Sequence, residues 1–347
     1  MTDSRRPDDP GLGGGALSEA EIDATEGISV EPITQWDLFI TRLRRHRLAM
    51  VAAIFLLMLF VVALAAPLVT CPPNEQYCGK LLENPAEQLL DPNGRLFVNI
   101  APRNHTEGVT ALALGTDELA RDVLARVVHG GRASLVVGVV TGLLVASLGT
   151  IVGSLAGYYP GPVDQALMRF TDLILGLPLL PVAIVVGRLI PELNFLPGWM
   201  KEGVWGITFL LGFLLWGTLA RIVRAEFLSL REKEFVEAAR AAGANDRRII
   251  FRHILPNAMS PIIVQTTLIV GAAIIIEAAL SFLGFGVREP TPTWGGMASS
   301  GAGIAVRGFW WELVFAGTAL VMTVLAVNFI GDGLRDALDP TQTIERK

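Results

Sequence analysis

The sequence predicts an all-α, polytopic integral membrane protein with about six transmembrane helices and a long cytoplasmic loop between the fourth and the fifth. Hydrophobic residues make up 52% of the 347 positions and charged residues only 18%, whereas soluble domains are nearer a quarter charged. The apolar residues are gathered in blocks of about 20, the length that a helix needs to cross a bilayer. The net charge of −5 gives no reason to expect nucleic-acid binding.

The N-terminal region divides into a polar tail and a first membrane segment. Residues 1–34 are acidic and rich in glycine, and because they contain few large apolar residues we predict a disordered tail. Residues 35–69 are predicted to form an interfacial helix with an arginine cluster, followed by a first span over 48–69. The motif Ala63-Leu64-Ala65 also resembles the cleavage site of a signal peptide. The distance between Met1 and the arginine cluster favours an uncleaved span.

Five further apolar blocks predict a five-helix core within residues 133–340. The expected spans are 133–157, 166–190, 204–223, 260–284 and 309–330. A loop over 224–256 connects the fourth and fifth spans of the whole chain, and residues 341–347 form a cytoplasmic tail. Two glycine pairs in the block at 133–157 have the G-x-x-x-G spacing that allows helices to pack closely in lipid; they are Gly138 with Gly142 and Gly149 with Gly153.

The orientation follows from the lysine and arginine residues near the span ends. They cluster before the first span and over 221–252, which predicts cytoplasmic termini and an extracytoplasmic loop over 70–132. Cys71 and Cys78 lie in that outer loop with six residues between them. We interpret them as a disulfide formed in an oxidising compartment; the alternative is two free thiols. Only His105 could join them as a zinc ligand, which is too few for a structural site.

The loop at 224–256 predicts two short helices separated by a glycine. Residues 231–242 are dense in alanine, glutamate, lysine and arginine, all good helix formers. Gly243 suits the left-handed position that ends a helix, and Asn245 or Asp246 can cap the next helix, which ends near Pro256. The alanines leave one helix surface almost without side chains, so the first helix can lie deep in a groove of a partner protein.

This segment resembles the cytoplasmic "EAA" loop of ABC importer permeases. The resemblance rests on Glu237-Ala238-Ala239, on Gly243 four residues later and on the pair Leu255-Pro256. In that family the loop is a coupling helix that docks on the ATPase. The resemblance therefore implies docking through Glu237, Ala238, Ala239, Arg240, Ala242 and Gly243. The alternative is a solvated, alanine-rich loop beside the membrane.

Other segments are similar to the dipeptide and oligopeptide permeases of the DppC/OppC type. They are Leu114–Arg126, Gly157-Tyr158-Tyr159, Glu277–Gly286 and Gly331–Pro340. The resemblance implies a permease subunit of a binding-protein-dependent importer in a bacterial or archaeal cytoplasmic membrane. Its expected partners are a second homologous permease, two ATPase subunits (or one in two copies), an extracytoplasmic substrate-binding protein and the lipid bilayer. Dipeptides, longer peptides, nickel chelates and glutathione all remain open as substrates.

The chain is not expected to be an enzyme. The phosphate-binding motif G-x-x-x-x-G-K-S/T is absent, and the only Gly-Lys pair, Gly79-Lys80, has no second glycine upstream. We therefore expect no cofactor on this chain, with ATP and Mg bound by the partner ATPase subunits. The alternative from another class is a secondary transporter or channel for small solutes, which needs no docking helix.

Three charged residues within the spans require an explanation. A charge in a membrane segment is costly unless it faces protein or water, and Glu277 lies in the fifth span. It either lines the translocation path, where it could meet the ammonium group of a peptide, or pairs with another subunit. Arg169 and Asp172 are spaced to pair with each other across one helical turn.

Overall fold

The structure, a computed structural model, describes residues 35–70, 73–74, 114–119, 121–194, 196–201 and 203–338. Its elements are helices, which confirms the all-α prediction; the extended pairing in these ranges is an isolated bridge between Thr116 and Asp122. The α-helices are α2 (Gln35–Arg45), α3 (Arg47–Leu64), α4 (Ala66–Val69), α6 (Val123–Tyr158), α7 (Pro162–Gly176), α8 (Leu179–Leu189), α9 (Gly198–Lys201), α10 (Trp205–Arg231), α11 (Glu234–Ala241), α12 (Asp246–Arg248), α13 (Met259–Phe282), α14 (Trp294–Ala305) and α15 (Trp311–Leu338). They are joined by a 3₁₀-helix, η1 (Ile190–Glu192), and a π-helix, η2 (Ile249–Ile254).

Five of these helices are long and apolar enough to cross a membrane, namely α3, α6, α10, α13 and α15. A sixth candidate span consists of α7 followed by Leu179–Glu192, which contains α8. The axes of the two parts are bent by 86° relative to each other. The span predicted over 166–190 is therefore a bent pair of helices and not one continuous helix. Pro178 forms the N-cap of α8 and Leu177 before it is extended, because proline removes an N–H group and disfavours the helical conformation of the preceding residue.

Two other differences from the sequence-based expectations concern the first residue of one helix and a helix that was not predicted. The helix α6 begins at Val123 rather than near residue 133, because the Asp122 side chain caps it by accepting from the N–H of Leu124. The segment 285–308, expected to be a plain connection, contains α14. Its N-cap Thr293 accepts from the N–H of Gly296 over 3.1 Å, and its many glycines conceal it in the sequence.

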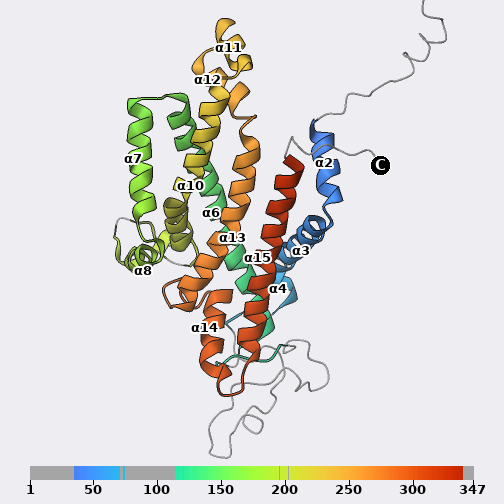
Figure 1. Cartoon of the computed structure of the whole chain (residues 1–347). Helices are drawn as coiled ribbons and strands as arrows, with labels where there is room; N and C mark the ends of the chain where they lie inside the picture. Colours follow the sequence, from blue (N-terminus) through green and yellow to red (C-terminus); the bar gives the residue numbers. More distant parts are fainter. Residues whose placement is uncertain are drawn as a thin grey trace, which may run out of the picture.

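Figure 1 shows α6 running through the bundle beside α10 and α13, and glycines on α6 allow these helices to pack closely. A Cβ atom added at Gly138 would lie 2.6 Å from the Ile274 side chain of α13, and one at Gly149 would lie 2.9 Å from Leu219 of α10. At such distances a larger residue would force its neighbours to shift. The predicted G-x-x-x-G pairs are thus confirmed as packing sites, and they serve two different neighbours: Gly138 and Gly142 face α13, whereas Gly149 and Gly153 face α10.

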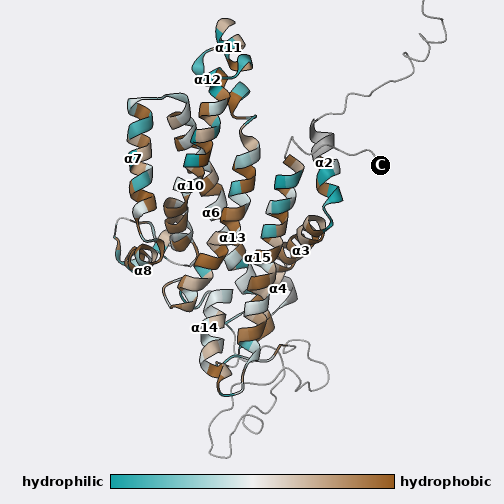
Figure 2. Ribbon diagram, viewed as in Figure 1, coloured by the Kyte–Doolittle hydropathy of each residue, from teal (hydrophilic) through white to brown (hydrophobic). Residues whose placement is uncertain are grey.

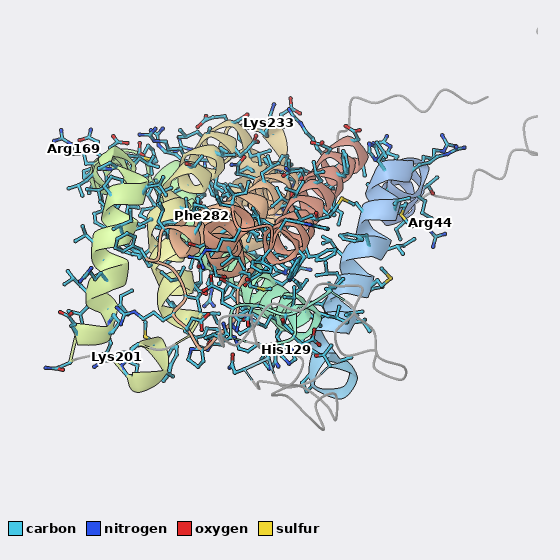
Figure 3. All side chains as sticks on the ribbon, turned by 90° about the horizontal axis from the view of Figure 1, so that it is seen from below. Arg44, His129, Arg169, Lys201, Lys233 and Phe282 are labelled. Carbon is cyan, nitrogen blue, oxygen red and sulfur yellow. The ribbon has the colours of Figure 1, made fainter. Side chains whose placement is uncertain are left out.

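The hydropathy of the surface matches a membrane protein. Figure 2 shows apolar residues along the middle of the long helices and polar residues on α11 and α12 at one end. In α3 the apolar side chains of Val51, Ile54 and Leu57 are each more than half exposed, as expected for a helix that faces lipid. Figure 3, a view along the bundle, shows α3 steeply tilted relative to α13 and α15; α3 contacts α15 where Gly333 meets Ala49.

Candidate functional site

The predicted docking residues lie on and directly after α11, which projects from one end of the bundle (Figure 1). Gly243 has φ +79°, and the helix ends in paired backbone bonds from Gly243 N–H to Arg240 and from Ala244 N–H to Ala239, each 3.0 Å. This is the left-handed ending that the sequence predicts. Asn245 caps the next helix by accepting from the N–H of Arg248 over 2.9 Å. The predicted helix, stop and second helix are therefore confirmed.

One side of α11 is anchored and the other is free to meet a partner. Val236 is fully buried in the same apolar cluster as Phe227 of α10 and Ile249 of η2. The docking residues are on the open side. All are exposed except the half-buried Ala239: Glu237, Ala238, Arg240, Ala242 and Gly243. Since alanine and glycine add little bulk, the backbone of α11 can approach a partner closely between the Glu237 and Arg240 charges.

Hydrogen bonds connect this segment to the end of α6, a feature that sequence reasoning missed. Tyr158 Oη donates to Asp246 Oδ1 over 2.7 Å, and Tyr159 Oη donates to Oδ2 of the same carboxylate over 3.2 Å. Arg231 at the end of α10 donates to the Tyr158 carbonyl over 3.3 Å. The only signal in the sequence is the pair of adjacent tyrosines after Gly157. The segment from α11 to Asp246, called the docking segment after its predicted role, is therefore hydrogen-bonded to the end of α6, which is itself bonded to the end of α10.

Ion pairs between α7 and α10 lie near the same end. Arg224 donates to both oxygens of Asp164, over 2.5 and 2.7 Å. Arg221 pairs with Asp172 at 2.6 Å. The predicted pairing of Asp172 with Arg169 is wrong, because the carboxylate reaches across to α10 instead of along its own helix.

Glu277 lies inside the subunit between α6 and α13. It is fully buried, and its two oxygens accept from Ser134 over 3.1 Å and from Ser281 over 2.7 Å. Both partners are hydroxyls of this chain, which provide the hydrogen bonds that a buried carboxylate requires. The role of Glu277 on a translocation path stays a prediction. Cys71 and Cys78 lie outside the described residues.

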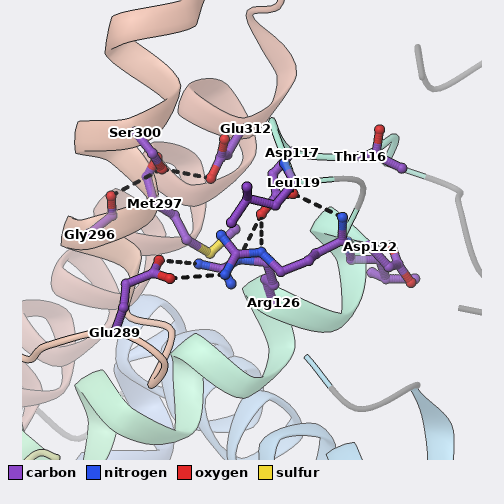
Figure 4. Close-up of polar contacts among 12 residues, drawn as sticks. Thr116, Asp117, Leu119, Asp122, Arg126, Glu289, Gly296, Met297, Ser300 and Glu312 are labelled. Atoms are coloured by element: carbon purple, nitrogen blue, oxygen red, sulfur yellow. Dashed lines mark hydrogen bonds and ion pairs between the residues drawn. The ribbon is translucent and has the colours of Figure 1, made fainter. Parts of the chain in front are cut away.

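At the end of the bundle opposite α11, a charged cluster joins the start of α6 to α14 and α15 (Figure 4). Arg126 is almost fully buried; it donates to Glu289 Oε1 over 2.9 Å and lies 3.4 Å from Asp117. Arg121 bridges the same two carboxylates, at 2.6 Å to Asp117 and 2.9 Å to Glu289. Beside them Ser300 donates to the buried Glu312 over 2.8 Å. The cluster holds together segments that are far apart in the sequence.

The pKa values of two carboxyl groups at this cluster are shifted in opposite directions. Burial raises the pKa of Asp122 to about 6, against the hydrogen bonds that it accepts from the backbone of Leu124 and Ala125. For Glu289, burial alone would raise the pKa. The hydrogen bonds and ion pairs from Arg121 and Arg126 outweigh burial and lower the pKa of Glu289 below its ordinary value.

Family comparisons agree with this architecture. Residues 149–344 match the model of the binding-protein-dependent transport system inner membrane component, and residues 34–89 match the N-terminal transmembrane domain of oligopeptide transport permease C. The dipeptide transport system permease protein DppC of Bacillus subtilis is 38% identical over 86% of this chain and 83% of its own length. The di/tripeptide permease DppC of Pseudomonas aeruginosa is 36% identical over 83% of this chain and 86% of its own.

A solved structure resembles the core of the fold. The inward-facing MetNI methionine ABC transporter aligns with a TM-score of 0.51 at 20% identity, and the alignment covers 62% of this chain and 98% of that one. At this identity the likeness concerns the fold alone. The sequence relatives and the family models carry the assignment further, because they cover most of the chain. The chain belongs to the inner-membrane components of binding-protein-dependent transport systems and is a multi-pass ABC importer permease of the DppC/OppC type.

Proposed function

We propose that this permease subunit forms the pathway of a peptide importer together with a second, homologous permease. The names of its relatives, which include dipeptide and di/tripeptide permeases, support peptides as the substrate class. A soluble binding protein delivers the peptide from outside, and both termini of the permease and α11 face the cytoplasm of a bacterium or archaeon. ATP and Mg bind to the ATPase subunits and not to this chain.

The observation that carries the proposal is the construction of α11. An exposed, alanine-rich surface between Glu237 and Arg240 is held by the buried Val236 and is hydrogen-bonded through Asp246 to α6. This arrangement suits a helix that docks on a motor protein, because the outer side adapts to a groove while the inner side moves with the transmembrane helices. Closure of the ATPases would then act on α6 and α10 through α11.

The test uses the complete transporter, reconstituted in proteoliposomes with its binding protein. We expect peptide uptake that requires both ATP and the binding protein. Glu237→Lys should lower uptake at least about tenfold, since it reverses a charge on the docking surface, while insertion in the membrane stays normal. Glu118→Lys is the matched control, because Glu118 is also exposed but lies at the opposite end.

Two results would overturn the proposal. Unchanged uptake in the Glu237→Lys transporter would remove the docking assignment. Transport of a solute by the purified chain alone, without nucleotide, would instead identify a secondary transporter or channel.

A further inference from the structure

Two adjoining cavities lie between α8, the start of α10 and the connection from α13 to α14, away from α11. The larger has a volume of about 780 Å³ and is lined by Arg188, Glu192, Arg288 and Glu289, among others. The second, of about 570 Å³, shares Arg288 and Glu289 and adds Lys201. These volumes are in the range of small-molecule sites, about 300–1,000 Å³, and neither cavity includes a residue of the docking segment.

The backbone brings the two arginines of the larger cavity to the same place. A Cβ atom added at Gly187 would lie 3.3 Å from the carbonyl oxygen of Phe285, so α8 touches the α13–α14 connection one residue before Arg188. That connection is itself folded tightly: Phe285 N–H donates to Leu280 over 2.8 Å, and Val287 N–H donates to Ser281 Oγ over 3.2 Å. Arg288 therefore extends from a fixed loop toward the same cavity as Arg188.

The charges that line the cavities are unbalanced. Within the described part of the chain, the exposed side chains of Arg188 and Arg288 form no ion pair or hydrogen bond. Glu289 is already paired with Arg121 and Arg126 at 2.9 Å each. Of the two acidic residues that line the cavities, Glu192 is therefore the one not paired with these arginines. In the larger cavity Arg188 and Arg288 thus face one available carboxylate, and the second cavity adds Lys201. The cavity offers a surplus of positive charge to a ligand.

The serine hydroxyls that line the larger cavity already donate within the chain, among them Ser281, which donates to Glu277 over 2.7 Å. Ser299 donates to the Phe282 carbonyl over 2.7 Å and Ser300 donates to Glu312 over 2.8 Å. The free donors are therefore the two guanidinium groups. A planar guanidinium binds a carboxylate through two parallel hydrogen bonds, which is the geometry that selects carboxylate over a neutral amide.

We propose that this cavity is a reception site for the transported peptide, in which Arg188 and Arg288 bind its terminal carboxylate and Glu192 faces its ammonium group. The inference rests on the proposed import of peptides and adds a charge-selective site on the permease itself. It concerns zwitterionic peptides with a free carboxyl terminus, released by the binding protein above the pathway.

The experiment measures peptide uptake and ATP hydrolysis together in the reconstituted transporter with its binding protein. Arg188→Gln combined with Arg288→Gln should lower the peptide transported per ATP hydrolysed by about tenfold or more, as expected when charge-assisted hydrogen bonds are lost. Stimulation of ATP hydrolysis by the peptide-loaded binding protein should persist, because the proposal assigns both arginines to the peptide and not to the docking of that protein or of the ATPases. Arg307→Gln, at an exposed arginine outside both cavities, should behave as the wild type.

Several results would overturn the inference while leaving the importer intact. One is a wild-type transport ratio in the double variant. Another is poor recovery of the second permease with the double variant, which would mean that the arginines bind a carboxylate of that subunit. A third is an effect that appears in vesicles with phosphatidylglycerol but not in pure phosphatidylcholine, which would identify a lipid phosphate as the ligand. If the wild type itself imports no peptide, the proposed function fails first.

Discussion

The hydroxyl of Tyr158, the last residue of α6, donates a 2.7 Å hydrogen bond to Asp246, 88 positions further along the chain. The bond joins a helix that is long enough to cross a membrane to the segment that follows α11. Together with the buried contacts of Val236 and Ile249, it gives the docking segment a short mechanical connection to the bundle. Movement of α11 is expected to move the end of α6 with it.

Tyr158→Phe tests this connection. The substitution removes a hydrogen bond to a carboxylate, worth about 1.5–3 kcal/mol when well shielded, and keeps the buried ring in place. We expect a severalfold fall in peptide transported per ATP hydrolysed, measured in proteoliposomes. Tyr159→Phe is the control and should have less effect, because its bond to Asp246 is longer, 3.2 Å, and exposed. Identical ratios in both variants and the wild type would show that the bond carries no coupling.

Gly243→Ala tests the left-handed ending of α11. At φ +79° an alanine is strained by about 1–2 kcal/mol, although the space around Gly243 is open. We expect the last turn of α11 to fray, with faster hydrogen exchange over 238–244 and reduced uptake. Gly303→Ala is the control. It also has open space but lies inside α14 without a positive φ, so its exchange should stay the same or slow down.

The helix, stop and helix around α11 could be predicted from the sequence because local chemistry determines them. Gly243 has a backbone conformation that glycine alone adopts easily, and Asn245 caps a helix within three residues of itself. Long apolar blocks likewise predict spans, since their burial in lipid depends on composition. Both signals are contained in short windows of the chain.

The remaining features depend on contacts between distant segments. The ion pairs from Arg121 and Arg126 to Glu289 join residues more than 160 positions apart, and no window of the sequence contains both partners. Asp172 could be assigned to the neighbouring Arg169 by spacing, yet the packing of α7 on α10 offers it Arg221. The glycines of α14 hid a helix that is held by Trp294, which is buried and donates to the Val127 carbonyl over 2.9 Å.

Gly149→Val tests the close packing of α6 on α10. A Cβ atom at this position would lie 2.9 Å from Leu219, so the larger side chain must push the helices apart. Overpacking of this kind costs about 1–3 kcal/mol, and we expect a lower melting temperature of the detergent-solubilised transporter. Gly176→Ala should leave the melting temperature unchanged, because a Cβ atom added at Gly176 would have no neighbouring atom within 4 Å. Leu219→Ala should restore part of the loss in the Gly149→Val background, and failure to do so would contradict this packing.

Glu289→Gln tests the contribution of the charged cluster to stability and its pH dependence. The pKa of Glu289 is lowered from 4.5 in the folded chain, so its contribution is complete above the ordinary pKa and is lost as the pH falls through the lowered value. Because the side chain is 62% exposed, we expect the contribution to be below about 1 kcal/mol. Asp122, with its pKa raised to about 6, acts in the opposite direction and stabilises the fold as the pH falls from above 6.

Melting temperatures between about pH 3 and pH 7 separate the two groups, because the Glu289 contribution is lost below its ordinary pKa and the Asp122 contribution changes around pH 6. In Glu289→Gln the melting temperature should no longer fall at the acidic end of this range, while the stabilisation that comes from protonating Asp122 as the pH falls should remain. In Asp122→Asn, which keeps a capping side chain, that gain should disappear instead. A Glu289→Gln protein whose pH profile follows that of the wild type would exclude Glu289 as the titrating group.

Arg126 and Glu312 are both buried in this cluster, yet their replacement should have unequal consequences. Arg126→Gln leaves Asp117 and Glu289 with one guanidinium fewer, and breaking a buried pair costs about 3–5 kcal/mol. In Glu312→Gln the new amide oxygen can still accept from Ser300. The substitution also removes a buried carboxylate whose Oε2 has no hydrogen-bond partner among the described residues. We therefore expect a change below about 1 kcal/mol for Glu312→Gln. Melting temperatures and recovery of the purified complex would compare the two variants, and equal losses would mean that Glu312 balances the charge of the arginines.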